Sequence, residues 1–478
     1  MKHVNHKTNS ADWVPFTRSV AYGTGMLGYA PLIQIYMHFY NPVFNDTPGL
    51  NPILIGWAIF LSRMWDAVTD PLMGSISDNT RSRWERRRPW IILGAVLCSL
   101  VFLALWWFPA GQSAGFYFGW LLIASLFFFL SFTIFSVPYI ALGMELSPDY
   151  HERTGVITIR TVIKQFGFFI VSSLFFLTSL DRFADRAEGM RFHSLWVAVV
   201  IFIVIAIPAL FAREHPMVAA ALERQDAQKS NQKIPLWISV KETLSCWPFL
   251  NLGLITIVNY IGVITVGSIG YHVTIYHLFG GNKSIASGKL MTIVGYSIPI
   301  SIMISLPLIN KLSKKIGKRN GLITAYSLTV IGALLRWPLY TPIYPYLSII
   351  PTVLFGIGCA GAYVFINAMI PDAIDADELK TSERRESMFS AMYGWTFKIG
   401  AAAAILLSGY VLQWTEFDAA LGANQAPETV YGLRFSFTWV AAVSLFMTVI
   451  LSLTYPITEQ RSHEIRAELE ARRYGKES

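Results

Sequence analysis

Residues 63–74 read RMWDAVTDPLMG and lie inside an apolar run, although they include Arg63, Asp66 and Asp70. In hydrocarbon each such charge costs roughly 2.5–3.5 kcal/mol on insertion scales. Asp66 and Asp70 are four residues apart, so on a helix they share one face, and Arg63 lies one turn before Asp66. This cost predicts that the three groups have partners or a function in common.

The composition predicts a polytopic membrane protein. Of the 478 residues 54% are hydrophobic and only 14% are charged, against about 25% charged residues in soluble domains. The mean hydropathy is +0.46. The net charge of +8 comes from basic residues in short clusters between apolar runs. This pattern is typical of membrane topology and not of nucleic-acid binding.

The sequence lacks the motifs of common enzyme classes. It has no HExxH, no GxSxG and no Walker lysine loop, so we expect neither an enzyme nor a bound cofactor. Cys98, Cys246 and Cys359 are scattered singly, which indicates neither a disulfide framework nor a cysteine metal site.

Twelve apolar segments are long enough to cross a membrane, which takes about 20 residues each. All should be helices, because lipid leaves unpaired backbone groups unsatisfied. The segments are residues 16–40, 52–76, 90–108, 115–146, 157–180, 193–212, 247–279, 287–310, 321–340, 345–371, 386–414 and 431–455.

The charges of the connecting loops predict the orientation. Loops 80–89 and 311–320 each carry five basic residues, whereas loops 41–51 and 109–114 carry none. The positive-inside rule then places both termini and the polar loop 213–246 in the cytoplasm. We expect the chain to span the plasma membrane, the inner membrane of a bacterial cell. One loop departs from this pattern, since residues 181–192 contain three arginines and three acids. These are Arg182, Arg186, Arg191, Asp181, Asp185 and Glu188.

The loop 213–246 divides the chain into an N-terminal half, 1–212, and a C-terminal half, 247–455, with a tail at 456–478. The basic loop between the second and third segments recurs between the eighth and ninth, about half a chain later. Two parallel six-helix halves are the pattern of the major facilitator fold, which we expect to work as a monomer with its substrate site near the midplane.

Two interpretations of the 63–74 stretch remain open. In the first, Arg63 pairs with one aspartate and the cluster only braces helices. In the second, the two carboxylates bind a cation, Na⁺ or H⁺, because one arginine does not neutralise two carboxylates. Apart from a possible Na⁺ at Asp66 and Asp70, no metal is expected.

Several motifs resemble the glycoside–pentoside–hexuronide:cation symporter family, whose type member is melibiose permease. The most specific is RMWDAVTDPLMG followed by TRSRW and RRRPWIILG. Weaker ones are YGTGMLG, FTIFSVPYIAL, ERTGVITIR and ESMFSAMYGWTFKIG, so the resemblance covers the whole transmembrane region. It implies a cation site at Asp66, Asp70 and Thr133, and substrate contacts at Arg160 and Lys398.

The departures from that resemblance concern the sugar. Ala30 and Ser136 stand where melibiose permease has sugar-binding aspartates, and Ile140 replaces its stacking aromatic residue. Arg160 and Lys164 share a helix face, which favours an anionic substrate such as a hexuronide; alternatively Lys164 pairs with Asp66 or Asp70. The other expected substrate contacts are Tyr29, Ser136, Tyr139, Tyr393 and Trp395.

Charged residues near the segment ends are expected to gate the transporter by pairing with the basic loops. We assign this role to Arg63, Arg81, Asp149, Arg153, Asp372 and Asp375. Arg336, at the end of segment 321–340, is instead expected to extend to the outer membrane interface.

The sequence therefore predicts a cation-coupled symporter that imports a small molecule, a sugar or glycoside. Its partners would be that substrate, the coupling cation and the lipid bilayer, with no nucleic acid. The alternative within the same fold is a symporter of lysolipids or other amphiphiles, as in the vertebrate sodium-dependent lysophosphatidylcholine symporters.

Overall fold

The computed structural model describes residues 13–45, 49–146, 150–180, 182–214, 243–282, 289–381 and 386–474. Every regular element within these ranges is a helix. Ten of the described helical stretches are long and apolar enough to cross a membrane. The prediction of an all-α, multi-pass membrane protein is confirmed.

The chain forms two compact units. Unit 1 comprises Met1–Asn51 and Leu61–Lys233, and unit 2 comprises Pro52–Phe60 and Ile234–Ser478. The first nine residues of the second helix thus belong to unit 2, where the Cα of Leu406 lies only 3.3 Å from the position of a β-carbon on Gly56.

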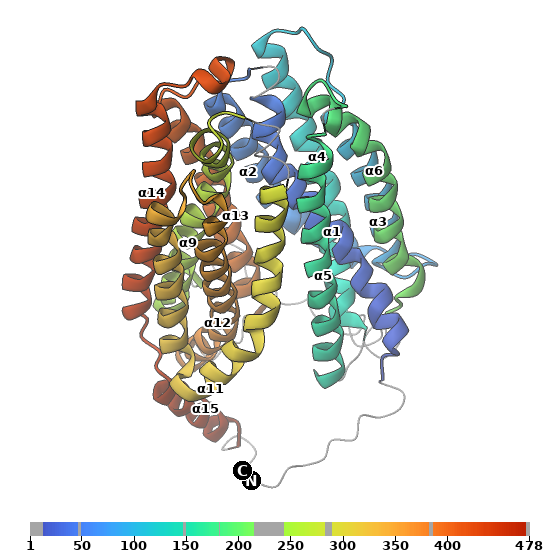
Figure 1. Cartoon of the computed structure of the whole chain (residues 1–478). Coiled ribbons are helices and arrows are strands. Elements are labelled where there is room, and N and C mark those ends of the chain that lie inside the picture. Colours follow the sequence, from blue (N-terminus) through green and yellow to red (C-terminus); the bar gives the residue numbers. More distant parts are fainter. Residues whose placement is uncertain are drawn as a thin grey trace. The chain divides into compact units, whose positions relative to one another are not determined.

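Unit 1 contains helices that match the first six apolar segments, as Figure 1 shows from blue to green. The second of them, α2, carries Arg63, Asp66 and Asp70, which lower its hydropathy; it is not among the ten apolar spans. The helices are α1 (Phe16–Phe44), α2 (Pro52–Asn79), α3 (Arg88–Trp106), α4 (Ala114–Glu145), α5 (Tyr150–Leu177) and α6 (Arg186–Phe211).

Unit 2 contains the remaining apolar segments. Segments 287–310 and 321–340, expected as separate helices, follow one another as α11 with a break at Gly317, whose φ of 77° and ψ of 171° are not helical. The elements are α9 (Trp247–His272) with the π-helical turn η1 (Val273–Leu278), α11 (Lys289–Leu339), η2 (Pro345–Ser348), α12 (Ile349–Thr381), α13 (Glu386–Trp414), η3 (Ala419–Asn424) and α14 (Pro427–Leu453).

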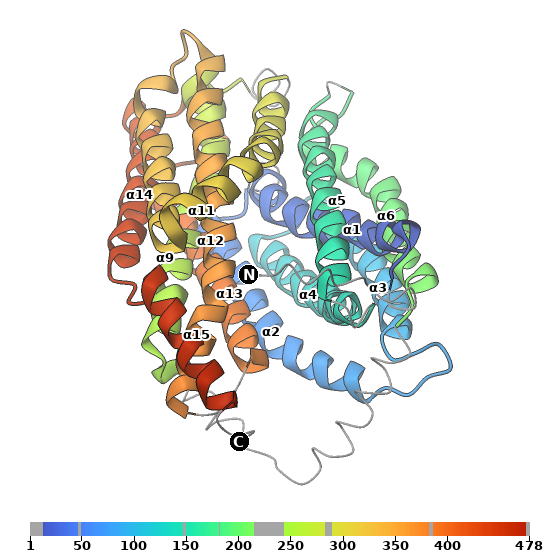
Figure 2. The same ribbon diagram turned by 90° about the horizontal axis from the view of Figure 1, so that it is seen from below.

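The C-terminal tail adds a helix that the hydropathy pattern did not predict, α15 (Glu459–Tyr474). It packs against α12 and α11, and Figure 2 shows it lying beside α12. Ile465 and Leu469, one turn apart on α15, are buried in this contact. A polar helix is thereby held on unit 2 by a narrow apolar stripe.

Close helix packing in unit 1 depends on glycines. A β-carbon on Gly94 of α3 would lie 2.6 Å from the Cα of Phe135 on α4, and one on Gly143 of α4 would lie 2.1 Å from the Tyr22 hydroxyl of α1. Small residues let helix backbones approach in membranes, where van der Waals packing drives association. Gly94 therefore sets the α3–α4 distance.

We predict that Gly94→Ala destabilises the protein by about 1–3 kcal/mol, the usual cost of overpacking, because the obstructing atoms belong to the Phe135 backbone. The matched control is Gly119→Ala on α4, where a β-carbon meets no atom within 4 Å. Thermal unfolding in detergent should show a lower Tm for Gly94→Ala and an unchanged or higher Tm for Gly119→Ala. Equal Tm values for the two variants would contradict this packing assignment.

Candidate functional site

The two aspartates of α2 converge on one hydroxyl of α4. The Thr133 Oγ1 atom lies 3.0 Å from Oδ1 of Asp66 and 2.8 Å from Oδ1 of Asp70. Thr133 is fully buried and Asp66 is 2% exposed. Two carboxylate oxygens and one hydroxyl oxygen thus lie close together, and oxygen atoms of this kind are the ligands that hard metal cations prefer.

Arg63 engages the opposite oxygen of Asp66. Its Nη1 lies 3.3 Å from Oδ2 of Asp66, and its guanidinium lies 4.4 Å from the centroid of the Phe129 ring. The ion pair of the first interpretation therefore exists, but it leaves the Oδ1 atoms turned toward Thr133. These three side chains of α2 carry a formal charge of −1, which matches one monovalent cation.

Hydrogen counting supports a cation or proton at this point. The Thr133 hydroxyl has a single hydrogen, which serves only one of the two carboxylate oxygens at a time. The Thr69 hydroxyl donates to the backbone carbonyl of Asp66 at 3.2 Å and also lies 3.4 Å from the Thr133 oxygen. A proton or cation at this point would reduce the repulsion between the two carboxylates.

The basic face of α5 reaches α1 through a tyrosine. Nη1 of Arg160 donates to the Tyr22 hydroxyl at 3.1 Å, and Lys164 lies one helical turn further along α5. The Tyr22 ring stacks on Tyr139 of α4, with ring centroids 4.8 Å apart. The structure thus brings α1, α4 and α5 together around Arg160.

Tyr139, expected from the sequence as a substrate contact, is engaged within unit 1. It is fully buried, and its hydroxyl donates to the Tyr22 carbonyl at 2.9 Å. Its partner Tyr22, which sequence reasoning missed, has one possible signal in the YGTGMLG motif, since α1 needs Gly25 to accommodate the Tyr139 ring. We therefore assign Tyr139 to helix packing and leave it out of the proposed substrate contacts.

The remaining expected substrate residues divide between the units. In unit 1, Ser136 of α4 is buried and the Tyr29 ring lies 4.8 Å from Phe132. In unit 2, Tyr393, Trp395 and Lys398 follow one another along α13. Trp395 is 36% exposed, whereas Tyr393 is partly buried.

Arg336 does not extend to an interface, so that expectation was wrong. The residue is 3% exposed, and its guanidinium lies 4.2 Å from the Phe355 ring centroid and 4.8 Å from that of Phe437. Two aromatic faces on α12 and α14 stabilise the charge by cation–π contacts inside unit 2.

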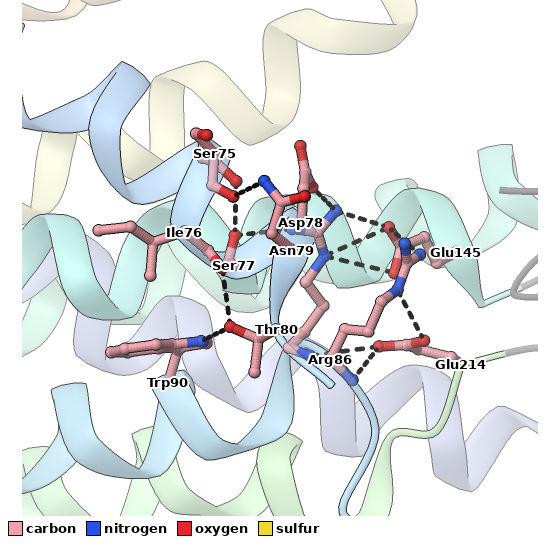
Figure 3. Close-up of polar contacts among 12 residues, drawn as sticks. Ser75, Ile76, Ser77, Asp78, Asn79, Thr80, Arg86, Trp90, Glu145 and Glu214 are labelled. Carbon is pink, nitrogen blue, oxygen red and sulfur yellow. Dashed lines mark hydrogen bonds and ion pairs between the residues drawn. The ribbon is translucent and has the colours of Figure 1, made fainter. Parts of the chain in front are cut away.

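A second charged cluster closes the α2–α3 end of unit 1, as Figure 3 shows. Nη2 of Arg87 lies 2.9 Å from Oε1 of Glu145 and 2.5 Å from Oδ1 of Asp78, and Nη1 donates to the Ser77 hydroxyl at 2.7 Å. Arg86 lies 3.5 Å from the same Glu145 oxygen. The Arg87 guanidinium just before α3 therefore joins the end of α2 to the end of α4.

Glu214, three residues beyond α6, both accepts hydrogen bonds from the α2–α3 loop and donates one to it. Its Oε1 accepts hydrogen bonds from the backbone N–H groups of Arg86 and Arg87 at 3.1 and 3.2 Å. Oε2 of Glu85, a residue with a left-handed φ of 68°, accepts from the backbone N–H of Glu214 at 3.0 Å. No sequence signal pointed to Glu214, because its partners lie more than 120 residues earlier.

The electrostatics of the cluster reflect its burial. Burial raises the pKa of the Glu145 carboxyl. The hydrogen bond and charge of Arg87 partly offset this rise, and the negative charge of Glu214 adds to it. For Arg87, burial opposes the charge, but the hydrogen bonds and charges of Glu145 and Asp78 outweigh it and raise the pKa of the guanidinium. The charged form of Arg87 is therefore stabilised by two acids, whereas burial disfavours the charged form of Glu145.

Unit 2 pairs its own basic loop with an acid of α12. Nζ of Lys318 lies 2.6 Å from Oδ2 of Asp372, and the Ser462 hydroxyl of α15 donates to Oδ1 of Asp372 at 3.0 Å. Asp375 lies one turn along α12 from Asp372 and is partly buried.

The other expected gating residues are less informative. Arg81 is exposed in the α2–α3 loop. Asp149 lies outside the described residues; Arg153 lies on α5, with its side chain outside the described part of the structure.

Comparison with known proteins gives a match over most of the chain. Residues 21–459 match the family model described as MFS/sugar transport protein. The isoprimeverose transporter of Lactiplantibacillus pentosus is 22% identical, with 89% of this chain and 85% of that protein covered. The sodium-dependent lysophosphatidylcholine symporter 1 of Homo sapiens is 24% identical, over 89% and 80%. The glucuronide carrier protein homolog of Escherichia coli K12 is 20% identical, over 90% of both.

A solved structure of a D-xylose–proton symporter has the same fold. Its TM-score is 0.67 at 14% identity, with 93% of this chain and 98% of that chain covered. This similarity supports the predicted major facilitator fold.

We predict that Arg87→Gln destabilises the protein by about 3 kcal/mol, because it leaves the buried Glu145 carboxylate without its main partner. Adding Glu145→Gln should recover part of that loss, since the two substitutions remove one interaction. Arg83→Gln, at an exposed arginine of the same loop, is the matched control and should leave Tm unchanged. Strictly additive losses in the double variant would show that the pair does not act as a unit.

Proposed function

The chain belongs to the family of MFS/sugar transport proteins, and we propose that it is a symporter that couples a cation at the α2–α4 site to import of a sugar or glycoside. The family match makes it a transporter and not an enzyme. Its substrate is a small molecule, and symport implies a coupling ion.

The observation that carries the proposal is the convergence of Asp66, Asp70 and Thr133. A monovalent cation balances the charge of Arg63 and the two aspartates, and its binding removes the repulsion between the neighbouring carboxylates. Na⁺ and H⁺ both satisfy this arrangement, and the experiment below separates them.

Coupling in this proposal runs through α4. Thr133 of the cation site, Ser136 and Tyr139 lie on that helix, and Tyr139 stacks on the tyrosine that Arg160 holds. A cation that fixes α4 against α2 therefore also fixes the surroundings of the basic residues on α5. Such linkage is reciprocal, so substrate would raise cation affinity by the same factor.

We further propose an acidic sugar derivative as the substrate, with Arg160, Lys164 and Lys398 as its charged contacts. Guanidinium and ammonium groups recognise carboxylates by charge-assisted hydrogen bonds. The glucuronide carrier homolog among the relatives is in keeping with such a substrate. Ser136, Tyr29, Tyr393 and Trp395 would contact sugar hydroxyls and ring faces.

The lysolipid alternative has a relative of similar identity in the human lysophosphatidylcholine symporter. The match to a sugar transport family model favours the sugar reading.

We propose that the protein works as a monomer in a bacterial inner membrane, with both termini in the cytoplasm. The basic loops 80–89 and 311–320 would then face the cytoplasm. The division into 1–212, 213–246, 247–455 and 456–478 remains our proposed domain organisation. Breaking and reforming the Arg87–Glu145 and Lys318–Asp372 clusters would accompany the transport cycle, with Arg63, Arg81, Asp149, Arg153 and Asp375 in the same gating role.

We predict that Asp70→Asn abolishes cation-driven accumulation, because one carboxylate already paired with Arg63 is left. Thr133→Val should lower the affinity for the cation by roughly 10- to 100-fold, which corresponds to the loss of one hydrogen bond to a charged group. Thr448→Val is the matched control, since that buried hydroxyl bonds its own helix at Leu445. Uptake into proteoliposomes with an imposed Na⁺ or H⁺ gradient measures both effects. Wild-type accumulation by Asp70→Asn would refute the cation site.

We also predict that a uronate displaces bound substrate better than its neutral parent sugar, and that Lys164→Ala or Lys398→Ala reduces this preference. Removing a cation lowers affinity for an anion more than for a neutral sugar. Lys380→Ala, at an exposed lysine of α12, is the control. Competition binding measures the ratio of the two affinities. Equal potency of the two sugars on wild type would exclude the acidic substrate and leave the symporter proposal standing.

A further inference from the structure

The α5–α6 end of unit 1 carries three arginines that the orientation rule does not explain. The acids of the same loop are engaged with the backbone: Oδ1 of Asp185 accepts from the N–H of Glu188 at 2.7 Å, and Oε2 of Glu188 accepts from that of Ala184 at 2.7 Å. This is a close variant of a helix capping box at the start of α6. Asp181 lies outside the described residues.

Arg182 stacks on aromatic rings and leaves its donors open. Its guanidinium lies 4.6 Å from the Phe183 ring centroid and 5.0 Å from that of Phe192, and the side chain is exposed. It forms no ion pair with any acid in the described part of the chain. A guanidinium stacked on a ring keeps its N–H groups in the plane, where they bind a phosphate by two parallel hydrogen bonds.

An apolar groove of about 260 Å³ runs between α1, α5 and α6 from this end. On α5 it is lined by Leu177, Ser173 and Phe169, which span about 12 Å at 1.5 Å per residue, and on α6 by Trp196. Phe192 and Trp196 are one turn apart on α6 and are 51% and 41% exposed. The ring of Phe192, over which Arg182 lies, is therefore one helical turn from Trp196 of the groove lining.

The groove has the chemistry of a hydrocarbon chain and not of a sugar. Its lining is almost entirely apolar, and the Ser173 hydroxyl already donates to the Phe169 carbonyl at 2.8 Å. A second arginine, Arg191, donates to the Phe108 carbonyl at 2.7 Å and lies 5.2 Å from that ring. Arg191 is thus engaged with Phe108, which is not part of the groove lining, and Arg182 is the arginine that the inference uses.

We propose that this groove binds one anionic phospholipid, with an acyl chain between α5 and α6 and the phosphate on Arg182. The binding site accounts for the arginines at an end of the bundle where the positive-inside rule expects few. A guanidinium binds phosphate oxygens by charge-assisted, often paired, hydrogen bonds. The site goes beyond the proposed transport function and does not depend on it.

The test is native mass spectrometry of the full chain released from detergent containing equal amounts of phosphatidylglycerol and phosphatidylcholine with identical acyl chains. Wild type should retain a single lipid, and the phosphatidylglycerol complex should be roughly fivefold more abundant than the phosphatidylcholine complex, the effect of one basic residue near a lipid surface. Arg182→Gln should lose this preference while still binding both lipids weakly. Ser173→Phe, which fills the groove, should lose the single retained lipid of either kind.

Arg83→Gln is the matched control, because Arg83 is also exposed and stacks on an aromatic ring, Trp84, in the α2–α3 loop. It should keep the wild-type preference. Retention of the preference by Arg182→Gln, or an equal loss in Arg83→Gln, would overturn the site and indicate diffuse attraction between a basic protein and anionic lipid. Unchanged lipid binding by Ser173→Phe in a variant with wild-type Tm would overturn the position of the acyl chain.

Discussion

The hydroxyl of Thr133 and the two carboxylates that converge on it constrain the whole of unit 1. Ionised aspartates in a membrane helix are costly, so α2 tolerates Asp66 and Asp70 only where other groups compensate their charge. Arg63 provides one compensation through Oδ2 of Asp66, and α4 provides the other by bringing its hydroxyl to Oδ1 of both residues. The position of α4 is in turn set by backbone contact at Gly94 of α3 and by the paired rings of Tyr22 and Tyr139.

The sequence predicted the features that depend on local spacing. The lengths of the apolar segments predicted the helices, and the loop charges indicated which loops are basic. The spacing of four residues placed Asp66 and Asp70 on one helix face. It predicted two segments, 287–310 and 321–340, joined by a basic loop, and the structure interrupts α11 at Gly317 within that loop. The apolar stripe of α15 is a local signal too, since Ile465 and Leu469 are one turn apart, but two residues are too few to stand out in a polar tail.

The features that the sequence did not predict depend on contacts between distant segments. Arg336 is stabilised by Phe355 and Phe437, and no local pattern distinguishes an arginine that meets two rings from one that reaches water. Glu214 binds backbone groups of residues that precede it by more than 120 positions. Tyr139 looked like a residue for sugar stacking because its type suits that role, yet its hydroxyl is committed to the Tyr22 carbonyl. The type of a residue indicated which interactions its side chain can form, but not whether that side chain is already engaged within the protein.

The two units solve one electrostatic problem in the same way. In each, basic residues meet an acid near the end of a long helix, Glu145 on α4 and Asp372 on α12. A segment beyond the last apolar helix of the unit adds a further contact through Glu214 or Ser462. Arg87 and Glu145 are both buried, whereas in unit 2 Asp372 is buried and Lys318 is partly exposed, so separating either pair would expose a buried carboxylate to water. In the proposed function, the cation site at Thr133 and the Arg87–Glu145 pair would lie on the same helix, α4, so a shift of α4 at one of them would move the other.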